Sequence, residues 1–301
     1  MVYLANAHRA ELIPLTSILW LLDIFNRVLL SSSAVSMTVT PSSCQQFAIL
    51  SFSKDSTFPS CSPGTYSYLM VPELSYFESH PFSLLLNEKE KCMQQIIRTS
   101  GTWTKRLIES HSNQSVRGFL EGPYEGMPFH LKKSRHLLFL SGGIGVTPNL
   151  SILRHLQHQT HLLNSLDRLQ FVWSLKQSDA ELIKLVEITS TADALNHNKC
   201  DLLGCDIFFT QANNPLMGYH RLDEESLVVN GLRLHYGRVD INSCIREFMT
   251  QSRLEDETLE VITVFVSGPA SMIEATLLSC NAISASQPRI RIDVQSESFC
   301  L

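Results

Sequence analysis

Short apolar stretches with a two-residue alternation fill the first half of the chain. Alternation of this kind is typical of β-strands, whose successive side chains point to opposite faces. Turn-forming residues such as Ser-Pro-Gly at positions 62–64 separate the stretches. The expected strands are residues 47–52, 66–70, 82–86, 93–99 and 116–120. Many short strands with turns between them predict a small antiparallel barrel.

The pattern changes from about Arg135. Strand-like runs are now apolar at every position, as in residues 137–140, and they alternate with segments that place apolar residues at helical spacing. A parallel sheet covered by helices on both faces requires such runs. The expected strands are residues 137–141, 169–174, 206–210 and 261–267, with one helix after Asp240. Residues 189–233 are irregular and are expected to contain surface loop. The predicted fold is therefore a β-barrel followed by a doubly wound α/β domain.

We expect three segments along the chain. Residues 1–33 form a membrane-proximal linker, residues 34–130 the barrel and residues 131–301 the α/β domain. The apolar stretch at residues 12–30 is interrupted by Pro14, Asp23, Asn26 and Arg27, and the charged Asp and Arg are costly in a bilayer. It therefore fits an amphipathic helix on a membrane, or the end of a segment truncated upstream, better than a spanning helix.

Composition and charge exclude some classes of protein. The formal charge of −5 argues against a nucleic-acid partner, since binding to phosphates needs a basic face. The eight cysteines show neither Cys-x-x-Cys nor zinc-type Cys/His spacing, so no metal site is expected. Reduced, mostly buried thiols on the cytosolic side of a membrane are the simplest interpretation.

A glycine turn links the first buried strand of the second half to a helix. Gly142, Gly143 and Gly145 lack Cβ atoms, so a phosphate or a planar ring can approach the backbone. Pro148 suits the first helical turn, and the helix N-terminus beyond offers N–H groups to an anion. On this pattern alone, nucleotide binding and a tight structural turn remain open alternatives.

Six motifs in chain order resemble those of ferric-reductase and NADPH-oxidase flavoproteins. The resemblance covers roughly residues 60–301. The motifs are PGTY (63–66), HPFS (80–83), GTWT (101–104), GPY (122–124), GGIGVTP (142–148) and VSGP (266–269), with a terminal SFCL tail at residues 298–301. Their shared order and spacing favour a ferredoxin-NADP reductase-like pair of FAD-binding and NAD(P)-binding domains.

The resemblance implies an FAD site on the barrel. Phe82 would pack against the isoalloxazine, and Ser83 would lie beside its N5 atom. Taken by itself, Phe82 is also a plausible barrel-core residue and Arg98 a solvated strand end. The residues implied for FAD are His80, Pro81, Phe82, Ser83, Arg98, Gly101 and Thr104, of which His80 and Arg98 would neutralise the pyrophosphate while Gly101 and Thr104 cradle it.

The resemblance also implies a nicotinamide site on the second domain. Lys176 and Arg238 are candidates for the 2′-phosphate of NADPH, although NADH is not excluded. Ser267 stands where many relatives carry cysteine, and Phe299 would shield the flavin until the nicotinamide displaces it. The residues implied for this cofactor are Gly142, Gly143, Gly145, Thr147, Pro148, Lys176, Arg238, Gly268 and Pro269.

The expected activity is hydride transfer from NAD(P)H to FAD, followed by single electrons passing to haem and a ferric chelate. Haem is expected only in a missing membrane half, because WLLDIFNR (residues 20–27) resembles the link after the family's last spanning helix. An oxidase that makes superoxide from dioxygen is the alternative enzyme. Departures at residues 84–86 and at Asn149 leave a third hypothesis, a catalytically silent membrane-associated interaction protein. In every case the protein is expected at the cytosolic face of a membrane.

Overall fold

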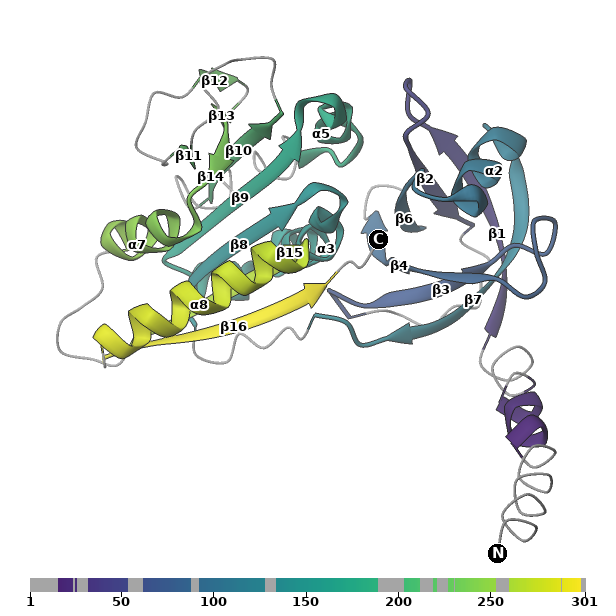
Figure 1. Ribbon diagram of the computed structural model, residues 1–301, viewed down its shortest axis with the longest axis horizontal. Coiled ribbons are helices and arrows are strands. Elements are labelled where there is room, and N and C mark those ends of the chain that lie inside the picture. The colour runs from purple at the N-terminus through teal and green to yellow at the C-terminus, as the bar shows by residue number, and fades with distance from the viewer. Residues whose placement is uncertain are drawn as a thin grey trace, which may run out of the picture.

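Two sheets, one antiparallel and one parallel, make up most of the molecule (Figure 1). The structure is a computed structural model. It describes residues 16–23, 25, 32–53, 62–87, 92–127, 134–188, 203–211, 219–220, 227–229, 231–252, 260–287 and 289–298.

The first sheet has seven strands in the order β4-β3-β7-β1-β2-β6-β5, and every pairing is antiparallel. Only Leu84 separates the two edge strands β4 and β5 in the chain, so the sheet curls toward closure. The predicted antiparallel barrel is confirmed as a curled, partly open sheet. Its elements are β1 (Ser32–Pro41), β2 (Phe47–Phe52), β3 (Tyr66–Met70), β4 (Ser79–Ser83), β5 (Leu85–Asn87), β6 (Cys92–Arg98), α2 (Thr102–His111) and β7 (Ser115–Tyr124).

Two barrel elements were not predicted from the sequence. Strand β1 buries Val35, Met37 and Val39 at alternate positions, as a half-buried strand should. Helix α2 lies in a region predicted to hold strands, yet it buries Trp103, Leu107 and Ile108 against the barrel core. The spacing of these three residues is helical, but the short segment carries no side-chain cap that would have marked its start.

The second sheet has the order β12-β13-β10-β9-β8-β15-β16 and is parallel except for β12 with β13. Helices cover both faces, which confirms the predicted doubly wound sheet. The core around α3 and α5 lies on one face, and the core that includes α7 and α8 lies on the other. In Figure 1, α8 lies in front of β15 and β16.

The elements of this part are β8 (His136–Gly142), η1 (Gly143–Gly145), α3 (Val146–His158), α4 (Thr160–Ser165), β9 (Arg168–Lys176), η2 (Gln177–Asp179), α5 (Glu181–Leu185), β10 (Leu203–Thr210), β11 (Tyr219–His220), β12 (Leu227–Val229), β13 (Leu232–Tyr236), β14 (Arg238–Val239), α7 (Ile241–Gln251), β15 (Glu260–Gly268), α8 (Ala270–Ser286) and β16 (Ile290–Ser298). Within residues 189–233, the region expected to contain surface loop, the described part holds β10, which confirms the strand predicted at residues 206–210. It also holds β11, β12 and the start of β13, which were not predicted. The last strand, β16, had not been anticipated.

The departures noted in the sequence fit the fold. Leu84 and Leu85 are buried, and Leu85 joins the core beneath α3. Asn149 is fully buried, and its side-chain amide donates to Leu140 O at 3.1 Å and to Ser141 Oγ at 2.8 Å. These residues therefore stabilise the junction of barrel, β8 and α3.

Residues 16–23 are helical. No helix within the described ranges combines the length and apolar character needed to cross a membrane. The boundaries proposed for the linker and the two domains, at residues 33 and 130, stay predictions.

Candidate active site between the two sheets

A cleft of about 890 Å³ lies at the carboxyl ends of the parallel strands. Its walls come from the ends of β8, β9, β10 and β15, from the start of α7 and from Arg98 of the barrel. The carboxyl edge of an open parallel sheet is where such folds bind ligands. The predicted residues that line it are Arg98, Gly142, Gly143, Gly145, Lys176, Arg238, Gly268 and Pro269.

The glycine turn forms the floor of this cleft. Gly143 has φ +54°, and a Cβ added there would meet no heavy atom within 4 Å, so its outer side is open. Its carbonyl accepts a hydrogen bond from Trp173 Nε1 at 2.9 Å. Trp173 is fully buried, so it holds the turn rigidly from below. Nothing in the sequence pattern indicated this role for the tryptophan.

The second predicted turn, at Gly268 and Pro269, packs directly on the first. A Cβ on Gly145 would lie 2.9 Å from Gly268 Cα, and one on Gly142 would lie 2.6 Å from Pro269 Cδ. Two backbones can approach this closely only where side chains are absent. The structure therefore brings together the two elements predicted to hold the nicotinamide. Beside them, Ser267 is fully buried and its hydroxyl has no partner among the described residues.

The HPFS motif lies on β4, and its serine contacts the glycine-turn helix. Ser83 and Thr147 are both buried, and their hydroxyl oxygens are 3.2 Å apart. Ser151 of α3 extends the contact by donating to Leu84 O at 2.9 Å. Residues predicted for two different cofactors thus meet across the boundary between the sheets.

Two further flavin candidates, His80 and Phe82, lie beside Trp103. Phe82 is half-buried and stacks on Trp103 with ring centroids 6.3 Å apart, and the His80 ring lies 4.6 Å from it. His80 Nε2 and Trp103 Nε1 are buried without a partner among the described residues. Buried donors of this kind normally find a partner, so they fit a site completed by a polar ligand.

In the loop before α2, the groups expected to bind a phosphate are hydrogen-bonded to one another. Thr104 Oγ1 accepts hydrogen bonds from the backbone N–H groups of Ser100, at 3.1 Å, and Gly101, at 3.2 Å. These groups therefore shape the loop. A Cβ on Gly101 would meet nothing within 4 Å, so the surface beside it is open. This open surface, together with the ring nitrogens of His80 and Trp103 that have no partner among the described residues, is compatible with a bound dinucleotide.

Two of the basic candidates lie on exposed ends of the cleft, and the third is paired. Lys176 ends β9 and Arg238 begins β14. Arg98 Nη2 lies 3.2 Å from Asp179 Oδ2, so it is neither a simple solvated strand end nor free. Asp179 carried no signal in the sequence. Phe299 lies outside the described residues, while Ser298, just before it, lines the cleft.

Glu297, at the end of β16, is a partly buried carboxylic acid at the junction with the barrel, and its Oε2 is enclosed without a hydrogen-bond partner among the described residues. A Cβ on Gly126 of the barrel would lie 3.2 Å from its Oε2. Burial raises the pKa of the Glu297 carboxyl to about 7. A carboxyl with a raised folded-state pKa stabilises the fold fully below its unfolded pKa, and this contribution is lost as pH rises toward 7.

We expect Glu297→Gln to flatten the pH dependence of stability between about pH 4.5 and 7. At pH 8 the variant should be more stable than the parent by on the order of 1–3 kcal/mol, because no buried charge forms. Urea unfolding across the pH range measures both effects. Glu109→Gln, on the exposed face of α2, is the control and should change little. An unchanged pH profile in the Glu297 variant would contradict the assignment.

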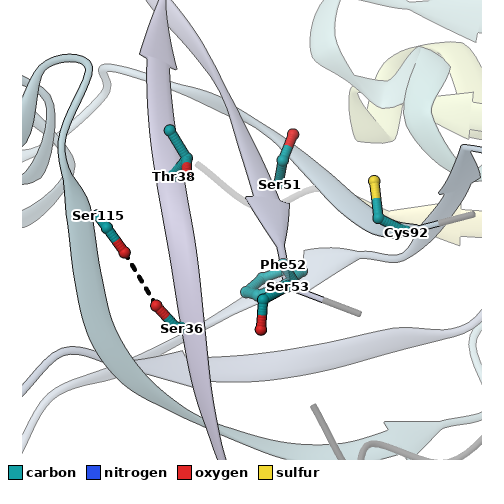
Figure 2. A pocket seen from close by; sticks show the side chains of 7 residues that line it. All are labelled: Ser36, Thr38, Ser51, Phe52, Ser53, Cys92 and Ser115. Atoms are coloured by element: carbon teal, nitrogen blue, oxygen red, sulfur yellow. Dashed lines mark hydrogen bonds between the residues drawn. The ribbon is translucent and has the colours of Figure 1, made fainter. Parts of the chain in front are cut away.

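A second pocket of about 360 Å³ lies on the barrel, away from the cleft (Figure 2). It is lined mainly by hydroxyl groups, and on one side of it Ser36 Oγ and Ser115 Oγ are hydrogen-bonded at 2.9 Å. None of the described residues that line it carries a charge at neutral pH. It therefore lacks the cations and glycine turns that make the larger cleft suitable for dinucleotides.

The arrangement defines a class of protein, the two-domain flavin reductases, in which a barrel and a parallel sheet share one cofactor cleft. This chain belongs to the ferric reductase and NADPH oxidase family of flavoproteins. Residues 31–147 match the FAD-binding domain and residues 134–281 match the ferric reductase NAD binding domain, so the two matches together span most of the chain.

Relatives of known description agree. A superoxide-generating NADPH oxidase heavy chain of Dictyostelium discoideum is 26% identical over 254 residues, 73% of this chain and 34% of that protein. Ferric reduction oxidase 4 of Arabidopsis thaliana is 33% identical over 102 residues, 33% of this chain and 15% of that protein. The chain therefore spans about a third of the oxidase's length.

Solved structures show the same fold. A ferredoxin NADP+ reductase from Neisseria gonorrhoeae with bound FAD and NADP superposes with a TM-score of 0.58 at 15% identity, covering 88% of this chain and 98% of that one. The two family matches, to an FAD-binding and an NAD-binding domain, give FAD and NAD(P) as the cofactors of this chain.

Proposed function

We propose that the chain is the dehydrogenase half of a membrane-bound reductase that passes electrons from NADPH through FAD to haem and a ferric chelate. The observation that carries the proposal is the buried contact of Ser83 with Thr147. It joins the predicted flavin strand to the predicted nicotinamide turn, as hydride transfer between two stacked cofactors requires.

When bound, FAD would accept two electrons as a hydride and pass them on one at a time. The protein would orient the nicotinamide and the flavin and shield the flavin. Gly143 and Gly268 would let the nicotinamide approach the backbone, and Ser83, held by Thr147, would present its hydroxyl beside the flavin N5. Phe82 would pack on the isoalloxazine, and Phe299 would cover its other face.

Basic side chains would bind the phosphate groups of both cofactors. Lys176 and Arg238 on the exposed rim of the cleft would hold the 2′-phosphate, which favours NADPH over NADH. Arg98 and His80 would bind the FAD pyrophosphate. Ferric iron is our proposed final acceptor because the matched nicotinamide domain is that of ferric reductases. Dioxygen, the acceptor implied by the oxidase relatives' names, is the second candidate.

Membrane association is proposed from the family and from the N-terminal helix. The helical residues Ile18, Trp20 and Phe25 are each more than half exposed, so they are placed to contact lipid or a neighbouring helix. The haem-bearing part would lie outside this chain.

The test is reconstitution of the purified chain with FAD. We expect a yellow protein that reduces a one-electron dye with NADPH and less efficiently with NADH. Absence of bound flavin together with absence of dye reduction would support the silent interaction protein instead. Joining the chain to a haem-bearing partner and comparing ferric chelate with dioxygen would identify the acceptor.

A further inference from the structure

The segment formed by η2 and α5 of the parallel-sheet domain contacts the barrel through two carboxylates. Asp179 is almost fully buried, and its Oδ2 lies 3.2 Å from Nη2 of Arg98. Two residues further along, Glu181 accepts hydrogen bonds from the backbone N–H groups of Ser43 and Cys44 at 2.6 and 3.1 Å. The two contacts tie one short segment to two separate parts of the barrel.

The two carboxylates differ in what they can influence. Glu181 meets only the turn between β1 and β2 in these contacts, and hydrogen bonds from Cys44 and Ser43 lower its pKa to about 2. Asp179 itself lines the cleft, and it contacts a cation, Arg98, that also lines it. A change at Glu181 should therefore affect the domain contact alone, whereas a change at Asp179 should also reach the ligand site.

Arg98 is held from two sides. Its guanidinium carbon lies 5.7 Å from the centre of the Phe47 ring, and Asp179 contacts Nη2. The side chain keeps 26% of its surface exposed, and guanidinium has five N–H donors in a fixed plane. Contact with Asp179 through Nη2 leaves other donors of the same plane for an anion in the cleft.

A buried carboxylate next to an anion site would by itself repel the anion. Because this carboxylate contacts the guanidinium, it instead orients the donor plane and removes the need to order a long side chain on binding. The same arginine then links the position of the parallel-sheet domain to anion binding on the barrel.

We infer that Asp179 is a positioning residue for FAD: it holds Arg98 in the orientation that binds the pyrophosphate, so flavin affinity depends on a contact from the nicotinamide domain. The inference rests on the proposed function, because Arg98 is assigned to FAD there.

The experiment measures FAD affinity of the apoprotein by flavin fluorescence for the parent, Asp179→Asn, Glu181→Gln, Arg98→Ala and the double variant Arg98→Ala/Asp179→Asn. We expect Asp179→Asn to weaken FAD binding about tenfold, since a charge-assisted contact that orients the ligand's arginine is lost. Glu181→Gln should change the affinity less than about twofold, although both single variants lower the melting temperature.

The double variant separates positioning from a purely structural role. If Asp179 acts through Arg98, the double variant binds FAD as weakly as Arg98→Ala and no more weakly. Equal effects of Asp179→Asn and Glu181→Gln, or an Asp179 effect that persists in the Arg98→Ala background, would overturn the inference. Should Asp179→Asn not fold, Asp179→Glu takes its place, and parent-like FAD affinity in that variant, with its displaced carboxylate, would overturn the inference too. A parent protein that binds no FAD at all would instead refute the proposed function.

Discussion

Replacing Gly143 with valine should abolish NADPH-dependent dye reduction while leaving FAD bound. Gly143 has φ +54°, which a β-branched residue rarely adopts, and the added side chain would enter the open cleft above the turn. We expect kcat/KM for NADPH to fall at least about 100-fold, equivalent to ~2.7 kcal/mol of lost transition-state stabilisation. Steady-state kinetics, with flavin content measured by absorbance, test this.

Gly101→Val is the matched control for this substitution. Its Cβ also meets nothing within 4 Å, but Gly101 has an extended backbone and lies beside the predicted FAD pyrophosphate site. Each change should cost the fold on the order of 1 kcal/mol, through backbone strain at Gly143 and a poorer N-cap at Gly101. The cofactor effects should be opposite, with the Gly101 variant losing FAD first. Normal NADPH kinetics in the Gly143 variant would contradict the placement of the nicotinamide.

Asp206→Ala should be the most destabilising of the proposed substitutions. Asp206 is fully buried in the middle of the parallel sheet, where it accepts hydrogen bonds from Arg233 Nε at 2.7 Å, His235 Nε2 at 2.9 Å and the Gln170 side chain. Removing the carboxylate leaves a partly buried guanidinium and a buried imidazole without their partner. Loss of one partner of a buried ion pair typically costs ~3–5 kcal/mol, and urea unfolding near neutral pH measures it.

The same cluster predicts the acid limb of stability. Burial by itself would raise the pKa of Asp206, but hydrogen bonds from Arg233 and His235 outweigh it and lower the pKa below its ordinary value. A carboxyl with a lowered folded-state pKa stabilises the protein above its unfolded pKa, near 4, and the contribution disappears as pH falls through the folded-state pKa. The parent should lose stability in this range more steeply than the alanine variant.

The control is Asp167→Asn. Asp167 pairs with Arg135 at 2.7 Å, and neither side chain is buried, whereas the Asp206 carboxylate has no exposed surface, so the loss should stay under about 1 kcal/mol. Similar losses in the Asp206 and Asp167 variants would show that the buried cluster contributes no more than a surface ion pair.

The cluster around Asp206 also shows a limit of prediction from the hydrophobic pattern. Asp206 lies in a strand expected from its apolar neighbours, yet nothing in that pattern indicates a buried ion there. Its partners Arg233 and His235 come from β13, a strand that was not predicted. Pairing of β10 with β13 creates the cluster, because that pairing brings residues nearly 30 positions apart side by side.

The sequence by itself determined the two-sheet architecture and the family. Uniformly apolar runs such as residues 137–140 are typical of strands covered by helices on both faces of the sheet. Six motifs in the family's order indicate the family, which no one of the motifs does alone. It also identified the glycine turn and the HPFS strand as candidate sites.

Only the tertiary structure decided how those parts meet. The contacts of Ser83 with Thr147, of Arg98 with Asp179 and of Gly145 with Gly268 join residues between 64 and 123 positions apart in the chain. Helical and strand periodicities report which face of an element is buried, but they carry no information about which other element lies against that face. The position of one sheet against the other, and with it the choice of Asp179 as the partner of Arg98, is a property of the folded chain.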